Sequence, residues 1–293
     1  MKTIVLAILA GVTLGSAHAL AATEAEAAAA FAKRDYTAAT VEQVRTAARI
    51  YGELAAVAGG PLEKARLLAA KSRALNVIGD SAKSSGDDKR DREERKAQYL
   101  EAADAAGEGL QLVGISDVTK ASSAQLRTLP DAQRSLMAEV LLWRAQALHN
   151  WATTDQPGFG GITVSWVAKW FEIRGALLLI RRIGKQAHRN YAADRLLGIG
   201  LGKTPRLLGG DSWKGYLHAM NAMQMTLVKN KVYSRDGAIN LAFADALVER
   251  EEEGKALAIL RAFVAAPVEE FDPADLPEVR RFKAEAARWI NDF

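Results

Sequence analysis

The sequence predicts an all-α protein, a superhelical array of helical hairpins of the tetratricopeptide-like α-solenoid type. Apolar residues recur at helical spacing in segment after segment, and the segments come in pairs joined by short turns. No stretch of alternating β-branched residues occurs in the sequence. Since one hairpin is too small to bury its own apolar face, stacked neighbours must share a continuous core. A compact helical bundle is the alternative, because a single pair of helices approaches the repeat template.

Composition narrows the function classes. The 293 residues are 49% hydrophobic and 25% charged, which is typical of a globular protein. The sequence contains no cysteine, which excludes disulfides, thiolate zinc sites and cysteine nucleophiles. The formal net charge is +4, a small excess, and nucleic-acid binding would need Lys and Arg concentrated on one face. We therefore expect no nucleic-acid partner.

The first residues predict export. Lys2 gives a positive start, the apolar stretch 4–14 is too short to span a bilayer, and alanines near Ala19 and Ala21 form a small-residue cleavage site. We expect a signal peptide over 1–21, a single helical domain over 22–293 without a membrane span, and a periplasmic or secreted protein. An uncleaved anchor or a buried helix is the alternative.

The N-terminal part of the mature chain predicts a helical hairpin. An alanine-rich run over 24–34 comes first, and then Thr40 is the expected cap of a helix that Gly59-Gly60-Pro61 ends. The second helix of the hairpin is expected over 62–78. The first part of the polar run 81–95 is expected to be a solvent loop, and its later part the outer face of the next helix, which continues over 97–113.

The middle of the chain predicts two long helices. A short helix is expected around 122–129, and Asp131 is well placed to begin the first long helix, which runs to Trp151. A glycine-rich loop over 153–161 follows. The second long helix, over 162–183, is the most apolar stretch of the mature chain, but charged residues interrupt it, so it is read as a nearly buried helix rather than a membrane span.

The sequence of the C-terminal part predicts four helices, of which the middle two form one more hairpin. Helices are expected over 213–229, 239–248, 255–264 and 278–290, with a proline-bearing link before the last. In the hairpin, four small and large residues fall at tetratricopeptide spacing: Ala244, Leu247, Ala256 and Leu260.

The segment 191–211 invites a specific functional claim. Tyr191 to Leu197 is read as a short helix that glycines end, followed by Gly202-Lys203-Thr204, which looks like the end of a phosphate-binding loop. The phosphate-loop motif needs a glycine where Leu197 stands, and a preceding strand, so the spacing argues against nucleotide binding.

Catalytic motifs are scarce. His149, His188 and His218 show no paired metal-ligand spacing, and the sequence has neither a GxSxG elbow nor a serine followed three residues later by lysine. A site assembled from distant residues stays open at this point. We expect no enzyme activity, cofactor or metal.

A binding surface is the remaining candidate. Helical spacing puts Trp166, Trp170 and Arg174 on one face, where aromatic walls and a guanidinium suit an apolar ligand with a carboxylate. The alternative is that the tryptophans are core residues. The full set of candidate ligand-binding residues is Trp143, Trp166, Trp170, Arg174, Arg206 and Trp213.

The same segment carries a resemblance. Leu196-Leu197-Gly198, Thr204-Pro205, Leu208-Gly209-Gly210-Asp211 and Lys214 resemble a segment of the T-component proteins of tripartite ATP-independent periplasmic (TRAP) transporters, which are exported tetratricopeptide-like proteins. The corresponding turn consists of Pro205, Gly209, Gly210 and Asp211. From the residues alone, the segment is also an ordinary turn between helices, because Pro205 cannot continue a helix and the glycines allow a tight turn.

The resemblance implies a non-enzymatic periplasmic protein. It would partner a substrate-binding subunit, hold a hydrophobic or organic-acid ligand, and often form a homo-oligomer. A general tetratricopeptide-like scaffold for protein interactions in the cell envelope is the alternative, since the same helices would serve it. An envelope hydrolase with a dispersed site is a third class.

Overall fold

The protein is helical throughout the part of the chain that the computed structural model describes, which is residues 23–81, 88–154 and 164–293. Within those ranges the one strand-like feature is an isolated bridge between Leu227 and Ser234. The all-α prediction is therefore confirmed. In the same ranges, no helix is long and apolar enough to cross a membrane.

The N-terminal part of the fold begins with a helix over 23–32. It continues with α2 (Ala38–Val57), α3 (Pro61–Ser81), α4 (Asp88–Leu112), the short α5 (Ser123–Arg127), α6 (Asp131–Thr153) and α7 (Val164–Arg182). In sequence order, α2 packs on α3, α3 on α4, α4 on α6, and α6 on α7.

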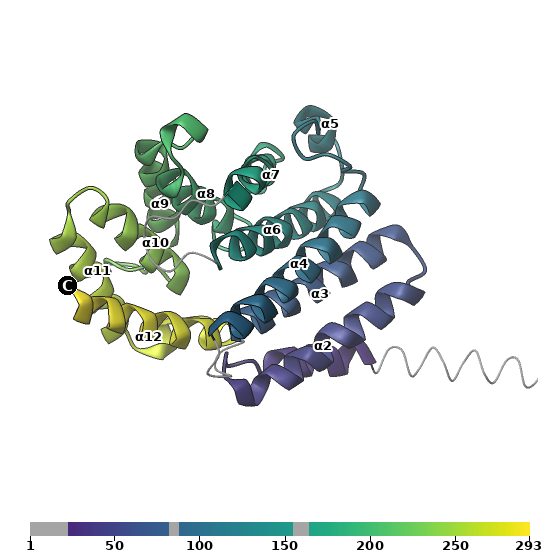
Figure 1. Cartoon of the computed structure of the whole chain (residues 1–293), viewed down its shortest axis with the longest axis horizontal. Coiled ribbons are helices and arrows are strands. Elements are labelled where there is room, and N and C mark those ends of the chain that lie inside the picture. Colours follow the sequence, from purple (N-terminus) through teal and green to yellow (C-terminus); the bar gives the residue numbers. More distant parts are fainter. Residues whose placement is uncertain (1–22, 82–87, 155–163) are drawn as a thin grey trace, which may run out of the picture.

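The C-terminal part consists of α8 (Ala192–Lys203), η1 (Arg206–Leu208), α9 (Ser212–Thr226), α10 (Gly237–Val248), α11 (Glu253–Ala265), η2 (Val268–Glu270), η3 (Pro273–Asp275) and α12 (Leu276–Asp292). Helix α8 packs on α9, α9 on α10, α10 on α11, and α11 on α12. The helices thus follow one another in space as they do in sequence (Figure 1).

Several helices begin at or near the residue that the sequence predicts. Helix α6 starts at Asp131, as predicted, and α3 starts at Pro61, one residue before the expected start, because the fixed backbone angle of proline suits the first position of a helix. The Asp211 carboxylate caps α9 by accepting a hydrogen bond from the Lys214 backbone N–H, 3.0 Å away. Asp236 caps α10 in the same way, through the backbone N–H groups of Ala238 and Ile239.

Helix α4 begins at Asp88, so the later part of the polar run 81–95 is helical, as the sequence predicts. The predicted cap of α2 was wrong. The N-cap of α2 is Thr37, not Thr40. Thr40 instead lies in the first turn of α2, and its hydroxyl donates a hydrogen bond to the carboxylate of Asp35, which precedes the helix. Most of the predicted loop over 153–161 lies outside the described residues.

The glycines of the segment 191–211 do not end a helix. Helix α8 continues through Gly198, Gly200 and Gly202, and stops at Lys203, before Thr204-Pro205. These glycines permit close packing instead. A Cβ at Gly198 would lie 3.0 Å from the Ala219 Cβ on α9, and a Cβ at Gly200 would lie 2.1 Å from the Trp170 ring. The prediction that glycines help to end this helix was therefore wrong, because packing outweighs their low helix propensity. The proline was also expected to end it, and the helix does stop just before Thr204-Pro205.

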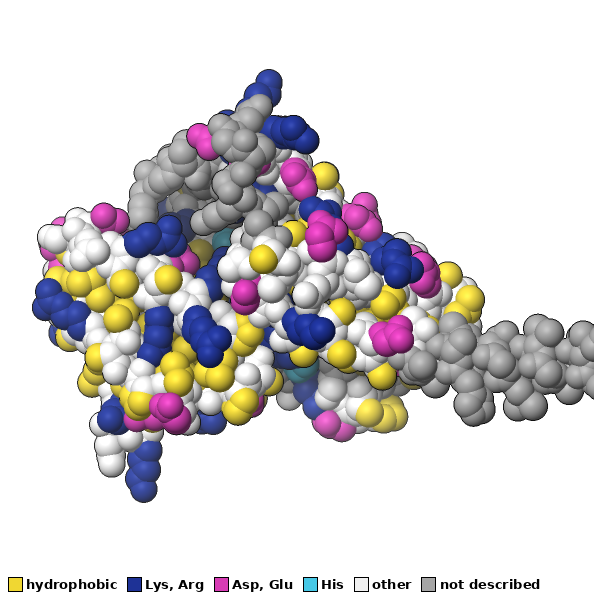
Figure 2. All heavy atoms as spheres, turned by 90° about the horizontal axis from the view of Figure 1, so that it is seen from below, with side chains coloured by type: hydrophobic (Ala, Val, Ile, Leu, Met, Phe, Trp, Pro, Cys, Tyr) yellow, Lys and Arg dark blue, Asp and Glu magenta, His cyan; other side chains and the backbone are white. Residues whose placement is uncertain are grey.

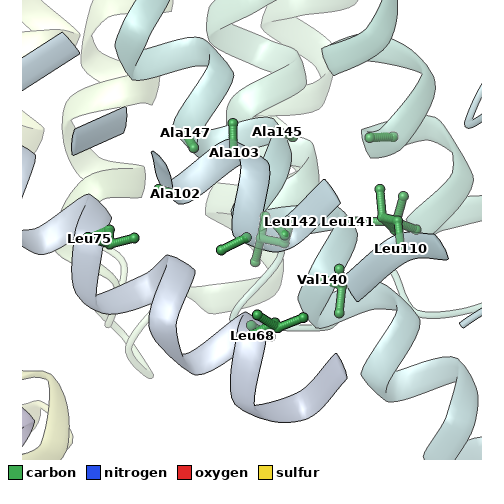
Figure 3. Packing of buried hydrophobic residues seen from close by; sticks show 14 of the residues in the cluster. Leu68, Leu75, Ala102, Ala103, Leu110, Val140, Leu141, Leu142, Ala145 and Ala147 are labelled. Atoms are coloured by element: carbon green, nitrogen blue, oxygen red, sulfur yellow. The ribbon is translucent and has the colours of Figure 1, made fainter. Parts of the chain in front are cut away.

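The buried apolar residues form two clusters. The larger one, which we call the N-terminal core, extends from Ala27 to Leu201, and the C-terminal core extends from Ala222 to Ala286. Figure 3 shows part of the N-terminal core, to which Leu68 and Leu75 of α3, Leu110 of α4 and Val140 of α6 belong, with Val140 drawn between Leu68 and Leu110. Alanines such as Ala102, Ala145 and Ala147 let these helices approach closely.

The last helix returns to the start of the fold. In Figure 1, α12 lies along the lower edge and reaches the N-terminal helices. Arg34, which precedes α2 and is almost fully buried, pairs with Glu278 of α12 at 2.7 Å and donates to the Ala274 carbonyl at 2.8 Å. Arg281 of α12 pairs with Asp80 of α3 at 2.5 Å. We call these contacts the closing contacts, because they join the two ends of the described chain.

Candidate functional site

A cavity of about 580 Å³ lies between the two cores. Helices α3, α6, α8, α10 and α12 each contribute to its wall, together with the link before α8 and the segment around η3. Its volume lies within the range of about 300–1,000 Å³ that is usual for small-molecule sites. The closing contacts of α12 complete this cavity, since Tyr36, Asp80, Glu278 and Arg281 all line it.

Arg73 of α3 is a cation of the cavity wall without a carboxylate partner. Its guanidinium lies 4.7 Å from the ring centroid of Phe31 and 5.6 Å from that of Trp143. No carboxylate of the described residues forms an ion pair with it. Burial and then the nearby Arg189 and Arg34 lower the pKa of Arg73. Two aromatic faces thus hold a partly desolvated cation at the cavity.

Arg195 of α8 is the second such cation. Its Nη2 donates a hydrogen bond to the Gln146 side-chain oxygen at 3.2 Å, while its buried Nε has no partner among the described residues. Burial lowers the pKa of Arg195, although it remains charged at any physiological pH. A buried guanidinium with an unused donor offers a charge-assisted hydrogen bond to an anion.

Carboxylates from the C-terminal part face these cations. Burial raises the pKa of Asp275, and the neighbouring Glu278 and Asp272 raise it further. Burial also raises the pKa of Asp236, against the opposing effect of the Arg195 guanidinium. Neither Asp236 nor Asp275 forms an ion pair within the described residues. The cavity therefore separates unpaired charges of opposite sign.

Neutral polar side chains line the cavity between these charges. The Asn150 side-chain amide donates to Asn76 Oδ1 and Asp80 Oδ1, each at 3.4 Å. Burial, and next the Arg195 guanidinium, lower the pKa of His149 to about 4. His149 is therefore neutral at pH 7 and adds no charge to the cavity.

Trp143 of α6 lines the cavity, and its orientation is fixed. Its indole Nε1 donates to Glu139 Oε1 at 2.7 Å, and the same carboxylate accepts from His188 and Arg189, each at 2.6 Å. Burial acts to raise the pKa of Glu139, but these hydrogen bonds lower it far below its usual range. Arg189, Asn190 and Tyr191 all have positive φ angles of 48°, 53° and 61°. Backbone strain of this kind concentrates at functional sites.

Of the α7 candidates whose side chains the structure describes, neither Trp170 nor Arg174 lines the cavity with Trp143. Trp170 has no exposed surface and packs on Gly200 of α8, in agreement with the alternative that it is a core residue. Arg174 donates a weak hydrogen bond of 3.5 Å to the Gly209 carbonyl and so supports the turn after α8. The side chain of Trp166 lies outside the described residues.

The turn after α8 has a geometry that needs its glycines. Gly209 has a φ of 84°, and a Cβ on Gly210 would lie 1.7 Å from the Thr204 carbonyl oxygen. Gly210 donates its backbone N–H to the Pro205 carbonyl at 3.1 Å. Arg206 and Trp213 line a shallow hollow beside this turn, remote from the cavity between the two cores. Lys203 pairs with Asp245 and Glu249, each at 2.8 Å.

Apolar side chains are exposed around the same turn. Leu207 is 99% exposed and Trp213 is 53% exposed. The Trp213 ring stacks on Tyr216 at 5.6 Å, and the Arg250 guanidinium lies 5.0 Å from the Trp213 ring. On the face shown in Figure 2, basic, acidic and apolar side chains are intermixed.

Two histidines take part in polar clusters. His218 of α9 contacts the fully buried Asp194 of α8 at 2.7 Å, and Asp194 also pairs with Arg181 of α7 at 3.3 Å. Gln186 and Asn221 donate to the same carboxylate at 2.9 and 3.2 Å. Across the described ranges, no group of three or more acidic or histidine side chains could hold a metal ion.

The cavity cations were not among the candidate residues that the sequence suggested. Arg73 and Arg195 lie on α3 and α8, far apart in sequence, and only the return of the chain brings them to one cavity. Of the predicted residues, Trp143 alone lines this cavity. No protein-family model matches the sequence, and neither does any curated protein.

Proposed function

We propose that the protein is a non-enzymatic, exported, tetratricopeptide-like binding protein that holds an organic-acid ligand in the cavity between its two cores. On this proposal it contacts a substrate-binding subunit, as the resemblance to TRAP T-components implies. Burial of the repeat-type residues supports the architecture, since Ala244, Leu247, Ala256 and Leu260 lie at the contact between α10 and α11 with at most 2% exposure.

The observation that carries the proposal is the pair of unpaired guanidinium groups at the cavity. A buried cation without a counter-charge is costly unless a ligand or solvent compensates it. Arg73 and Arg195 are both partly desolvated, and neither has a carboxylate in ion-pair contact within the described residues. A carboxylate ligand would compensate both, and the nearby Trp143 would supply apolar contact area.

Native mass spectrometry of the protein purified from its own compartment tests the ligand. We expect a co-purified organic acid on the wild-type chain and its loss from Arg195→Gln, which removes the cation but keeps a side chain of similar reach. Arg49→Gln is the matched control, because Arg49 lies on the exposed surface of α2. A chain that retains the same bound mass after Arg195→Gln would contradict the proposed site.

The second candidate is a protein-interaction scaffold. The exposed Leu207 and Trp213 beside the turn after α8 favour it, because exposed apolar residues near a cation mark binding surfaces. A pull-down that recovers a substrate-binding subunit would support the first candidate, and recovery of other envelope proteins alone would support the second. Trp213→Ala should abolish either capture, while Phe171→Ala, an equally exposed aromatic on α7, should not.

A further inference from the structure

Four charged side chains without an ion-pair partner face the cavity from its two sides. Arg73 and Arg195 come from helices of the N-terminal core, whereas Asp236 and Asp275 come from the caps of α10 and α12 in the C-terminal part. Each of these four side chains lacks an ion-pair partner among the described residues. Other charged residues also line the cavity: Asp80 of α3 and Arg281 of α12 pair with each other, and Arg235 precedes α10. Among the four groups without an ion-pair partner, the cations lie on the N-terminal side and the carboxylates on the C-terminal side.

The guanidinium groups act electrostatically on the opposite carboxylates without forming ion pairs with them. The Arg195 guanidinium lowers the pKa of Asp236 against burial, and the Arg73 guanidinium acts in the same direction on Asp275. Yet the nitrogen and oxygen atoms of both pairs stay beyond the distance of about 4 Å that defines an ion pair. The cavity keeps them apart, so the opposed charges leave room for a bridging molecule.

We propose that the cavity binds a small zwitterion of the amino-acid type, whose carboxylate pairs with Arg73 and Arg195 and whose ammonium group pairs with Asp275 and Asp236. This inference rests on the proposed function and names the ligand class for the same cavity. A simple organic acid would satisfy the guanidinium groups but leave both carboxylates unpaired. A simple amine would leave both guanidinium groups unpaired. A zwitterion satisfies both walls.

The apolar part of the wall sets the kind of side chain that the ligand carries. Val77, Leu142, Leu196 and Phe282 line the cavity between the charged groups, and Trp143 adds an aromatic face. These residues suit an uncharged aliphatic or aromatic side chain. The cavity volume of about 580 Å³ also leaves room for an unblocked dipeptide.

Isothermal titration calorimetry on the full mature chain tests the inference. The probes are the free L-amino acids and unblocked dipeptides of leucine and phenylalanine, each compared with the analogue that lacks its amino group and the analogue that lacks its carboxylate. We expect at least one zwitterion to bind, and each single-charge analogue to bind at least about tenfold more weakly, since each loses one set of charge-assisted hydrogen bonds.

Substitutions in the cavity test which residues bind the carboxylate of the ligand and which bind its ammonium group. Arg73→Gln should weaken the zwitterion at least about tenfold, and Asp275→Asn should do the same while leaving the deaminated acid unchanged. Arg49→Gln and Asp292→Asn, both on the outer surface, are the matched controls. Circular dichroism and thermal melting check that each variant is folded.

The outcomes separate this inference from the proposed function. If the deaminated acid binds as tightly as the zwitterion and Arg73→Gln weakens both, the organic-acid function holds and the zwitterion is excluded. If no zwitterion binds, the inference is overturned. If no acid binds either and native mass spectrometry finds an empty cavity, the proposed function fails as well.

Discussion

The absence of a side chain at Gly215 allows α8 and α9 to pack closely. An ideal Cβ at this position of α9 would lie 2.7 Å from the Gly202 backbone nitrogen and 2.8 Å from the Gly198 carbonyl oxygen on α8. Backbone atoms cannot rotate away, so Gly215→Ala should force α8 and α9 apart. We expect the free energy of unfolding to fall by about 2–3 kcal/mol, measured by urea denaturation.

Gly52→Ala is the matched control for that substitution. Gly52 also lies inside a helix, α2, but its added Cβ would meet only the flexible Lys71 side chain at 3.5 Å. We expect a gain of about 0.5–1 kcal/mol, because alanine favours the helix over glycine. Equal losses for both variants would show that close packing of α8 on α9 is not the cause.

His149 should make the fold sensitive to mild acid. Its pKa in the folded protein is about 4, below the value of 6.5 for a free histidine, because of burial and the Arg195 guanidinium. Between these pH values the unfolded chain takes up a proton at His149 that the folded chain does not, so acid favours unfolding. The free energy of unfolding should fall by up to about 3 kcal/mol from pH 6.5 to pH 4 through this group.

The comparison with His149→Gln isolates that effect. Asp236, Asp245 and Asp275 have raised pKa values and act in the opposite direction, since the folded protein protonates them more readily than the unfolded chain. We therefore compare the free energies of unfolding of wild type and His149→Gln. As the pH falls from 6.5 to 4, the wild type should lose more of this free energy than the variant does. A difference that stays constant with pH contradicts the assignment.

The sequence predicted Trp143 as a candidate ligand-binding residue, but it did not predict the cavity arginines Arg73 and Arg195. Helical spacing tells which residues share a face of one helix, and so it placed Trp170 and Arg174 together. It does not tell which face meets a neighbouring helix, and Trp170 is in fact buried against Gly200. Arg73 and Arg195 share a cavity only through long-range packing, which leaves no local pattern.

At the scale of elements, a buried carboxylate joins α7, α8 and α9. Asp194 has no exposed surface and accepts contacts from Arg181, His218, Gln186 and Asn221. Asp194→Ala would leave these donors without their acceptor. We expect a loss of about 3 kcal/mol in the free energy of unfolding, measured by denaturant titration.

An exposed aspartate is the control for that variant. Asp131 also pairs with two basic side chains, Arg134 and Lys185, but its own side chain is 70% exposed. Asp131→Ala should cost about 1 kcal/mol or less, since solvent screens surface pairs. If both variants lose the same stability, the Asp194 cluster does not hold the three helices together.

The existence and order of the helices could be predicted, whereas several of their ends could not. The start of α6 followed from the favourable position of Asp131 and agrees with the structure, and a short helix was expected where α5 lies. The continuation of α8 through three glycines did not, because glycine has a low helix propensity and the compensation comes from contact with Trp170 and α9. Helix propensity therefore failed to predict the end of α8, where neighbouring helices pack most closely.

At the scale of the whole molecule, the closing contacts bring both ends of the described chain together. Arg34 is 5% exposed and Glu278 is 22% exposed, so their ion pair is shielded from solvent. A double-mutant cycle with Arg34→Ala and Glu278→Ala should give a coupling energy of about 2–3 kcal/mol, measured by thermal or chemical unfolding.

The surface pair Arg49–Glu53 supplies the matched cycle. Both of its side chains are more than half exposed, at 62% and 58%, and it lies within one helix. Its coupling energy should not exceed about 0.5 kcal/mol. A value for Arg34 and Glu278 that is no larger would mean that the ends of the chain are only loosely associated.

Neither the return of α12 nor the second core could be predicted from the sequence. A linear array of hairpins was the expectation, and the order of helix contacts along the chain fits it. The contact between Arg34 and Glu278 joins residues from opposite ends of the sequence, and nothing in either neighbourhood signals the other.

Stacked hairpins commonly melt from their termini inward, because a terminal unit has one neighbour instead of two. Here the opening turn and the final helix are neighbours of each other through Arg34, Tyr36 and Glu278. Because each of these two segments is held by the other, we expect neither of them to unfold first. We expect this closed arrangement to make unfolding cooperative, so that the cavity between the two cores persists until the chain unfolds as a whole.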